Sequence, residues 1–413
     1  MVLGKDVHGS NGRLLLREGQ TVEERHLRIL NIWGVTEVFV RHEDCPDPSA
    51  ECGDDPLLAL ARETVAARFA VPRPLGPPLA ELERQCVLEA AAQLLREKGA
   101  KPPRADAAPP RVSGSRPPAT SSLGPSGASS PGPDIEALTG TDSGLASLPD
   151  IHQRIATALD DPACTAGMLA GIISKDPGLS ARILRMVNSP AQGLARKVDT
   201  LTRAVVVLGV REVSQLALGM SVFGLFGNLR SDFFPIRDFW RHSLACGVFA
   251  RLLAARMGRK DVERFFVAGM LHDVGRLVML RLAPEHLAEA VRQAGERRIA
   301  LVEAERDVFG YTHCDVAARL LERWLLPESL TELVSRHHAP LESRLPEDAS
   351  VIHVADALAL AFGLGNGGQA LFTGLSPEAW ALLGQPESII ATSAAQARRQ
   401  LDDIEAVFSG AHA

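Results

Sequence analysis

The chain has few of the features that mark nucleic-acid-binding or secreted proteins. It contains one tyrosine and 5% aromatic residues, so stacking platforms for single-stranded nucleic acid are scarce. Its formal net charge of −6 gives no basic footprint for a phosphate backbone. Its six cysteines form no CxxC pair, which fits a reducing compartment better than secretion. We therefore expect no nucleic-acid partner.

Long apolar runs are also missing. The first residues, MVLGKDVHGSNGRLLL, lack the continuous apolar stretch of a signal peptide, and no later segment reaches bilayer length without charge or glycine. We therefore expect a cytoplasmic protein with no membrane partner. The apolar share is 46% of 413 residues, which suffices for at least one large core in a chain of two or three domains.

Residues 1–44 predict a small α/β module. Leu14–Leu16 is a short apolar run, and Thr21 with Glu24 forms a capping-box pair before a helix that ends near Gly34. The β-branched residues of 35–40 then predict a strand. Two amphipathic stretches, 57–70 and 79–98, predict a helical connector over residues 45–100.

Residues 101–146 predict a flexible linker. The segment KPPRADAAPPRVSGSRPPATSSLGPSGASSPGPD is rich in proline, serine, glycine and alanine and has no apolar periodicity. Such a segment buries too little surface to offset the entropy of ordering. After it, over residues 147–409, the helical period returns and strand signals vanish. Prolines separate segments of about 10 to 20 residues, which is the usual length of globular helices, so we expect an all-helical domain.

Within this domain the stretch GMLHDVGRLVML places His272 beside Asp273 in strongly apolar surroundings. Burial of such a pair is unfavourable unless partners satisfy both groups. Other histidine and aspartate residues in similar surroundings complete the set of candidate ligands: His242, His272, Asp273, His313, His337, His338, His353 and Asp356. Convergence on one another or on a cation would remove several penalties at once, and imidazole with carboxylate suits iron, manganese or zinc. The alternative is a purely structural set of hydrogen bonds, which is the more common role of a single buried His–Asp pair.

The order His242, then His272-Asp273, then Asp356 resembles the metal ligands of the HD superfamily of phosphohydrolases. The preceding text, ISKDPGLSARILRMVNSPAQGL and TLTRAVVVLGVREVSQLAL, resembles the opening half of the HDOD domain, the HD-related output domain. EAERDVFGYTHCDVAARLLERWLLPESLTELVSRHHAP and IHVADALALAFGLG continue this resemblance. It implies an all-helical bacterial signal-transduction output to which no general enzymatic activity is attached. The N-terminal text GRLLLREGQTV and ILNIWGVTEVFV also resembles small modules that precede such domains.

Further residues resemble the HD-GYP phosphodiesterases of cyclic di-GMP. His313, His337 and His338 match their additional histidines. HD-GYP enzymes carry a lysine where this chain has Arg276, and arginine can clamp a phosphate but does not readily release a proton. No Gly-Tyr-Pro follows the paired histidines, which argues against cyclic di-GMP as substrate.

Two function classes remain open. The first is a non-enzymatic signalling adaptor that binds a partner protein or a small-molecule or nucleotide ligand. The second is a metal-dependent phosphohydrolase or phosphodiesterase, with Asp273 and Arg276 in catalytic roles and a divalent Fe, Mn or Zn ion as cofactor. A third idea, DNA binding through Val210–Phe223, is weaker because basic residues are sparse there. The oligomeric state is left open.

Overall fold

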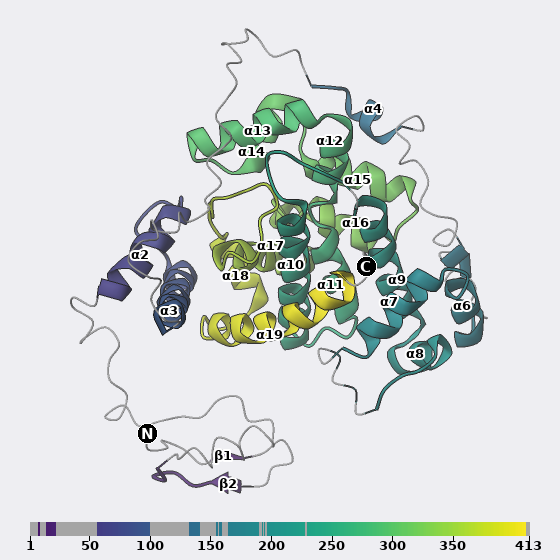
Figure 1. Ribbon diagram of the computed structural model, residues 1–413, viewed down its shortest axis with the longest axis horizontal. Coiled ribbons are helices and arrows are strands. Elements are labelled where there is room, and N and C mark those ends of the chain that lie inside the picture. Colours follow the sequence, from purple (N-terminus) through teal and green to yellow (C-terminus); the bar gives the residue numbers. More distant parts are fainter. Residues whose placement is uncertain are drawn as a thin grey trace, which may run out of the picture. The chain divides into compact units, whose positions relative to one another are not determined.

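A computed structural model describes residues 7–8, 14–21, 56–99, 132–140, 154–155, 157–158, 164–189, 192, 194, 196–227 and 229–409. The chain divides into two compact units, residues 1–62 and 63–413. Their elements (Figure 1) are β1 (Val7–His8), β2 (Leu14–Leu16), α2 (Pro56–Arg68), α3 (Pro77–Gly99), α4 (Ile135–Thr139), α6 (Ala166–Ile173), α7 (Pro177–Val187), α8 (Leu201–Leu208), α9 (Val210–Phe226), α10 (Ile236–Arg256), α11 (Val262–Leu271), α12 (Val274–Leu282), α13 (Pro284–Arg297), α14 (Leu301–Phe309), α15 (His313–Arg323), α16 (Glu328–Ser335), the 3₁₀ helix η4 (Pro340–Glu342), α17 (Pro346–Ala361), α18 (Pro377–Leu383) and α19 (Ile389–Ser409).

The first unit contains a two-stranded antiparallel sheet. Val7 of β1 lies opposite Leu16 of β2, and both side chains are buried. The predicted helix that ends near Gly34 and the predicted strand over 35–40 lie outside the described residues. Further along, α2 and α3 agree with the two helices predicted over 57–70 and 79–98.

The predicted all-helical class of the larger unit is confirmed. Its described residues form helices and no strand, apart from one isolated bridge between Phe69 and Phe372. Local chemistry sets the helix ends: the Asp176 side chain accepts from the Leu179 amide and Pro177 occupies the first turn of α7. Asn188 ends α7, and its amide donates to the Leu184 and Val198 carbonyls. Asn188 therefore ends the helix, and Pro190 lies outside the described residues.

The core of this unit is organised around α10, which packs against α11, α17 and α19 (Figure 1). Two glycines allow α10 and α11 to approach closely, because a Cβ on Gly269 would lie 2.8 Å from the Gly247 Cα. Helices this close leave little room between their side chains. The crossing therefore fixes the position of His242 on α10 relative to His272 at the end of α11.

One short helix, α4, falls inside the predicted linker. It packs against α12 and α15, and Leu138 and Thr139 are buried. Just before it, the Tyr311 hydroxyl donates to the Pro133 carbonyl at 2.6 Å, and Gly132 lies against Phe309. Apolar contacts, this hydrogen bond and the ion pairs of Glu136 with Arg319 and Arg323 of α15 thus hold residues 132–140, which composition alone did not predict. Residues 101–131 lie outside the described part of the chain.

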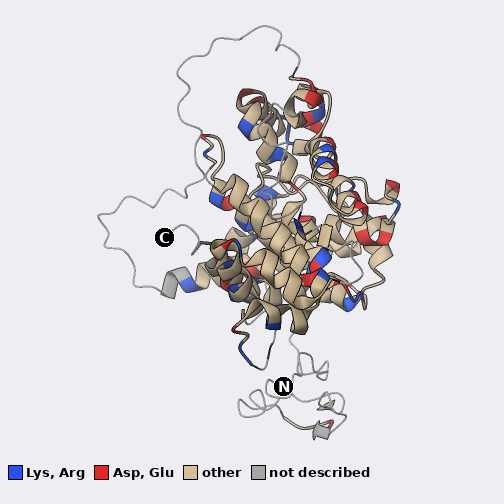
Figure 2. Cartoon of the chain, turned by 90° about the vertical axis from the view of Figure 1, so that its right-hand side faces the viewer, with Lys and Arg blue, Asp and Glu red and all other residues tan. Residues whose placement is uncertain are grey.

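Charged residues of both signs are interspersed on the outer helices, while the central helices are mainly uncharged (Figure 2). Among the described residues, no single helix is both long enough and apolar enough to cross a membrane. The pair α8 and α9 meets both criteria only when taken together, and it is bent by 119°.

Candidate metal centre

Four side chains from three helical regions meet at one point in the larger unit. His242 comes from α10, His272 and Asp273 from the junction of α11 and α12, and Asp356 from α17. His242 Nε2 lies 3.0 Å from Asp356 Oδ1, and His272 Nε2 lies 3.3 Å from Asp273 Oδ2 and 3.6 Å from Asp356 Oδ1. His242, His272 and Asp273 are buried, whereas the Asp356 side chain keeps 15% exposure. We call these four residues the HD cluster.

A second group adjoins the HD cluster. The ligand atoms of His313, Cys314, His337 and His338 lie within 4.8 Å of one another. His313 Nε2 lies 3.4 Å from His337 Nε2 and 3.2 Å from Asp273 Oδ1, so this group is continuous with the first. We call these four residues the Cys314 cluster. Cys314 was not among the residues predicted from the sequence, although it directly follows a predicted ligand.

Hydrogen bonds fix the orientation of the buried imidazoles. Nδ1 of His272 donates to the Gly269 carbonyl and Nδ1 of His337 donates to the Val334 carbonyl, each at 2.7 Å. Nδ1 of His313 contacts Glu305 Oε2 at 2.5 Å. All three rings therefore turn Nε2 toward the centre, which is the arrangement of histidines that bind a metal through Nε2.

Arg276 and Glu305 form a buried ion-pair network beneath the two clusters. Arg276 Nη1 lies 2.5 Å from Asp273 Oδ2, and Arg276 Nε donates to Glu305 Oε1 at 2.8 Å. Glu305 also accepts from the His313 backbone amide at 2.9 Å. Arg276 was predicted from the sequence as a functional residue, whereas Glu305 was not. In the sequence, Glu305 stands out only because it is a charged residue on the apolar face of its helix, eight positions before His313.

The buried charges do not balance without further cations. Asp273, Asp356 and Glu305 carry three negative charges, and Arg276 supplies one positive charge. Burial alone would raise the pKa of Asp273, but the Arg276 guanidinium and the His272 imidazole hold it well below its usual value. The remaining two charges can be compensated by protons on histidines or by one divalent metal ion.

The histidine and glutamate pKa values reflect the same imbalance. Burial opposes charge on His272, yet the Asp273 carboxylate raises its pKa well above the usual value. Burial and the positive charge of Arg276 also oppose charge on His313, but the Cys314 thiolate and the Glu305 carboxylate together raise its pKa to about 10. For Glu305, the positive charges of His313 and Arg276 outweigh burial and lower its pKa to about 2. The site thus favours bound cations or protons.

The residues fit a metal ion by their donor set and by their unsatisfied atoms. His272 Nε2 and Asp273 Oδ1 are buried and have no hydrogen-bond partner among the described residues. Imidazole and carboxylate donors together bind first-row divalent ions. His353, in contrast, belongs to neither cluster, because both of its ring nitrogens contact backbone groups. Nδ1 contacts the His337 carbonyl at 2.9 Å, and Nε2 accepts from the Ser376 amide at 3.0 Å.

A glycine-rich loop, residues 363–368, covers the HD cluster. Arg276 Nη1 donates to the Gly367 carbonyl at 3.3 Å. A Cβ on Gly367 would lie 2.5 Å from Asp273 Oδ2 and 3.2 Å from His242 Cδ2. Gly365 has a φ of +83°, which favours glycine. A Cβ on Gly365 would also collide with backbone atoms of Asp238 and His242 in α10. Only glycine backbone can approach the carboxylate this closely, so the loop closes the site.

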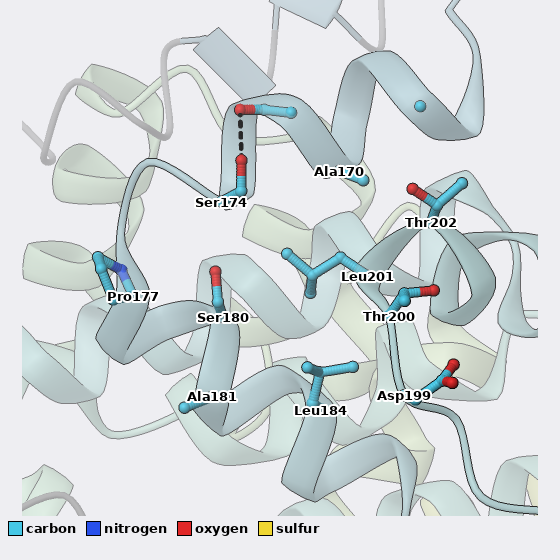
Figure 3. Close-up of a pocket in the computed structure, with 12 residues that line it drawn as sticks. Ala170, Ser174, Pro177, Ser180, Ala181, Leu184, Asp199, Thr200, Leu201 and Thr202 are labelled. Carbon is cyan, nitrogen blue, oxygen red and sulfur yellow. Dashed lines mark hydrogen bonds between the residues drawn. The ribbon is translucent and has the colours of Figure 1, made fainter.

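A separate groove of about 720 Å³ lies between α6, α7 and the start of α8 (Figure 3). Its walls are small or hydroxyl-bearing residues such as Gly171, Ser180 and Thr200, and the Ser174 hydroxyl is bonded to the Gly171 carbonyl. Among the described residues that line it, Asp199 is the only charged one. The groove therefore offers no cation for a phosphate group, and phosphoester chemistry would depend on the HD cluster.

Comparisons with known proteins agree with this fold. The family model of the HDOD domain matches residues 145–340. An uncharacterised protein of Treponema pallidum (strain Nichols) is 26% identical over 195 residues, 47% of this chain and 37% of that protein. Ribonuclease Y of Fervidobacterium nodosum is 25% identical over 182 residues, 44% of this chain and 29% of that protein. The matches thus span about a third of these relatives' lengths.

Solved structures show the same helical fold. An HDOD domain protein of unknown function from Geobacter sulfurreducens superposes with a TM-score of 0.55 at 24% identity, covering 67% of this chain and 97% of that one. A "Putative phosphohydrolase" from Shewanella amazonensis gives a TM-score of 0.52 at 22% identity, with 66% and 98% covered. A "Putative signal transduction protein" from Marinobacter aquaeolei gives 0.54 at 22% identity, with 68% and 64% covered. The resemblance of this region to the HDOD domain, inferred from the sequence, is confirmed, whereas the resemblances of the N-terminal text and of the additional histidines stay predictions.

Proposed function

Because this chain carries an HDOD domain, we propose that it is a signal-transduction output protein that acts by binding a partner or ligand, without catalytic turnover. Its HD cluster holds a divalent transition metal ion that stabilises the fold. His242, His272, Asp273 and Asp356 are the ligands of this ion. Iron, manganese and zinc all suit this set of nitrogen and oxygen donors.

The closure of the HD cluster carries this proposal. Asp273 already pairs with Arg276, and the backbone of Gly367 lies directly over its carboxylate. A hydrolytic metal site needs an open coordination position for water and substrate. The glycine loop and the guanidinium occupy the space beside Asp273 Oδ2, which leaves a phosphoester little room on that side of the cluster. A bound ion would supply Lewis-acid chemistry, but here the surrounding residues hold it away from substrate.

A metal-dependent phosphohydrolase is the second candidate. The observation in its favour is that His272 Nε2 and Asp273 Oδ1 point inward with no hydrogen-bond partner among the described residues. Arg276 would then steady a phosphate through Nη2, which likewise has no partner there. This function requires the 363–368 loop to move away from the cluster.

Turnover by the metal-loaded full chain separates the two functions. The protein is loaded with Mn²⁺, Fe²⁺ or Zn²⁺ in turn and assayed against cyclic dinucleotides, nucleotides and a generic phosphodiester. We expect bound metal by elemental analysis and no hydrolysis above that of Asp273→Ala. Hydrolysis that disappears in a folded Asp273→Ala variant would replace the binding function with the enzymatic one.

A further inference from the structure

The Cys314 cluster combines one sulphur with three imidazoles, unlike the HD cluster, whose donors are nitrogen and oxygen only. Cys314 Sγ lies 3.5 Å from His313 Nε2 and 3.8 Å from His337 Nδ1. His313, Cys314 and His337 are buried, and the buried His338 Nε2 atom has no hydrogen-bond partner among the described residues. Imidazole nitrogen and thiolate sulphur are the donor types that zinc takes in proteins, and four donors are the number that it usually binds.

The orientation of two imidazoles gives independent support for a cation here. His313 Nδ1 faces Glu305, and His337 Nδ1 faces the Val334 carbonyl, so each ring uses that nitrogen as a donor. Their Nε2 atoms then face each other at 3.4 Å. If both rings were neutral, the lone pairs of the two Nε2 atoms would point at each other and repel in a buried space. A positive charge between them, from a proton or a metal ion, removes this repulsion.

The start of α15 presents the two central donors in the required direction. Thr312 and Asp315 form a capping box, in which the Thr312 backbone amide and hydroxyl both contact Asp315 Oδ2 at 2.8 Å. This cap fixes the first turn, which carries His313 and Cys314. Gly275 allows α12 to approach that turn, because a Cβ there would lie 2.0 Å from the His313 carbonyl oxygen. The donors are therefore held by backbone packing.

We propose that His313, Cys314, His337 and His338 form a second metal site, in which the Cys314 thiolate selects a thiophilic divalent ion such as Zn²⁺. Binding replaces the S–H bond with a metal–sulphur bond and releases the thiol proton to solvent. Asp273, through Oδ1, lies between this site and the HD cluster. The inference deepens the proposed function. It rests on the proposal that the HD cluster holds a metal ion, and it adds the chemical class of a second ion.

Cobalt substitution of the full chain tests the sulphur ligand directly. The protein is stripped with a chelator and reloaded with Co²⁺ alone. A sulphur-to-cobalt charge-transfer absorption is expected in the wild type and should be lost in Cys314→Ser. Cys86→Ser is the matched control, because Cys86 is a buried cysteine whose Sγ instead contacts the Ala361 carbonyl. The band should persist in that variant.

Cys246 is a rival source of sulphur because it lies beside His272. Loss of the band in Cys246→Ser with retention in Cys314→Ser would overturn the assignment. Absence of the band in the wild type would do the same.

X-ray absorption on the Zn²⁺-loaded wild type needs no variant, so misfolding cannot affect its answer. One sulphur at about 2.3 Å from zinc is expected, and a shell of nitrogen and oxygen alone would refute the second site. Neither measurement involves phosphoester turnover. Failure of the thiolate site is thus distinguishable from failure of the proposed binding function, which only hydrolysis would overturn.

Discussion

The HD cluster, the Cys314 cluster, Arg276 and Glu305 together form a polar centre. This polar centre and the α6–α8 groove differ in both their chemistry and their accessibility. The centre collects carboxylates, imidazoles, a guanidinium and a thiol, and almost all of them are buried. The groove is open, yet the described part of its lining contains one carboxylate and no cation. A hydrolase needs its chemical groups where substrate can reach them. Here the reactive groups are enclosed and the accessible hollow is chemically bland, which favours a centre that maintains shape and a surface that makes contacts.

The largest expected effect comes from breaking the charge balance of the centre. Glu305→Gln removes a buried negative charge that pairs with Arg276 and with the His313 ring, and it leaves Asp273 as the remaining carboxylate partner of Arg276. Loss of one member of a buried ion pair leaves an uncompensated charge and should lower the free energy of unfolding by about 3–5 kcal/mol. The midpoint of urea unfolding measures this. Glu303→Gln, an exposed position on the same helix, is the matched control and should change stability by less than about 0.5 kcal/mol.

Equal effects of the two glutamate variants would mean that the network adds nothing beyond surface electrostatics. The closed centre would then be no more important to the fold than the groove. A large loss in Glu305→Gln alone would establish the centre as a structural element, independently of whether it binds metal.

A smaller loss is expected when the loop over the HD cluster is forced away. In Gly367→Ala the added Cβ would lie 2.5 Å from Asp273 Oδ2, so the loop or the carboxylate must shift. Overpacking of this kind lowers stability by about 1–3 kcal/mol. Amide hydrogen exchange of residues 363–368 should also become faster, because the loop no longer packs against the HD cluster.

Gly295→Ala on α13 provides the contrast, because a Cβ there meets no atom within 4 Å. It should stabilise the protein slightly, as alanine does in an exposed helix. If Gly367→Ala were neutral and exchange of the loop unchanged, the loop would not be the barrier that encloses the HD cluster.

The sequence predicted the helical domain and the HD cluster well, but for different reasons. Helical periodicity and capping residues such as Asp176 act over a few positions, so they are visible in the text. His272 and Asp273 were visible because polar residues stand out in an apolar run. Whether they bind metal stays a prediction, since convergence in space is compatible with protons as well as with an ion.

What the sequence did not reveal depends on tertiary contacts. Glu305 lies on a helix with an ordinary mixture of charged residues, and only packing shows that it is buried under Arg276. The role of Gly367 depends on a loop meeting a carboxylate 94 positions earlier in the chain. The segment just before the short helix α4 is held by Tyr311 and Phe309, which lie far away in sequence. No local pattern encodes these contacts.

A pH experiment separates burial from charge pairing, because Cys86 is buried without a charged partner in hydrogen-bond contact. Burial raises its pKa from 9.0 to about 12. Its contribution to stability is therefore complete below pH 9 and is lost as the pH rises toward 12, since the unfolded thiol ionises first. At pH 10 the loss should be about 1.4 kcal/mol relative to pH 8.

Cys86→Ala should remove this part of the alkaline slope, measured as the difference between the unfolding free energies of variant and wild type from pH 8 to pH 10. A difference that stays constant with pH would show that Cys86 ionises equally in both states. The burial around α3 would then be looser than the contact with Ala361 indicates.

The smallest effect tests the open side of the comparison. Gly171 lies within α6 on the wall of the groove, and a Cβ there meets no atom within 4 Å. Gly171→Ala should therefore stabilise the chain by about 0.5–1 kcal/mol, because alanine loses less backbone entropy in a helix. Gly269→Ala is the counterpart at the crossing of α10 and α11, where the Cβ would collide with Gly247 and destabilise the protein. If Gly171→Ala were also destabilising, the groove would be filled by another part of the chain, and the contrast between a closed centre and a free surface would no longer hold.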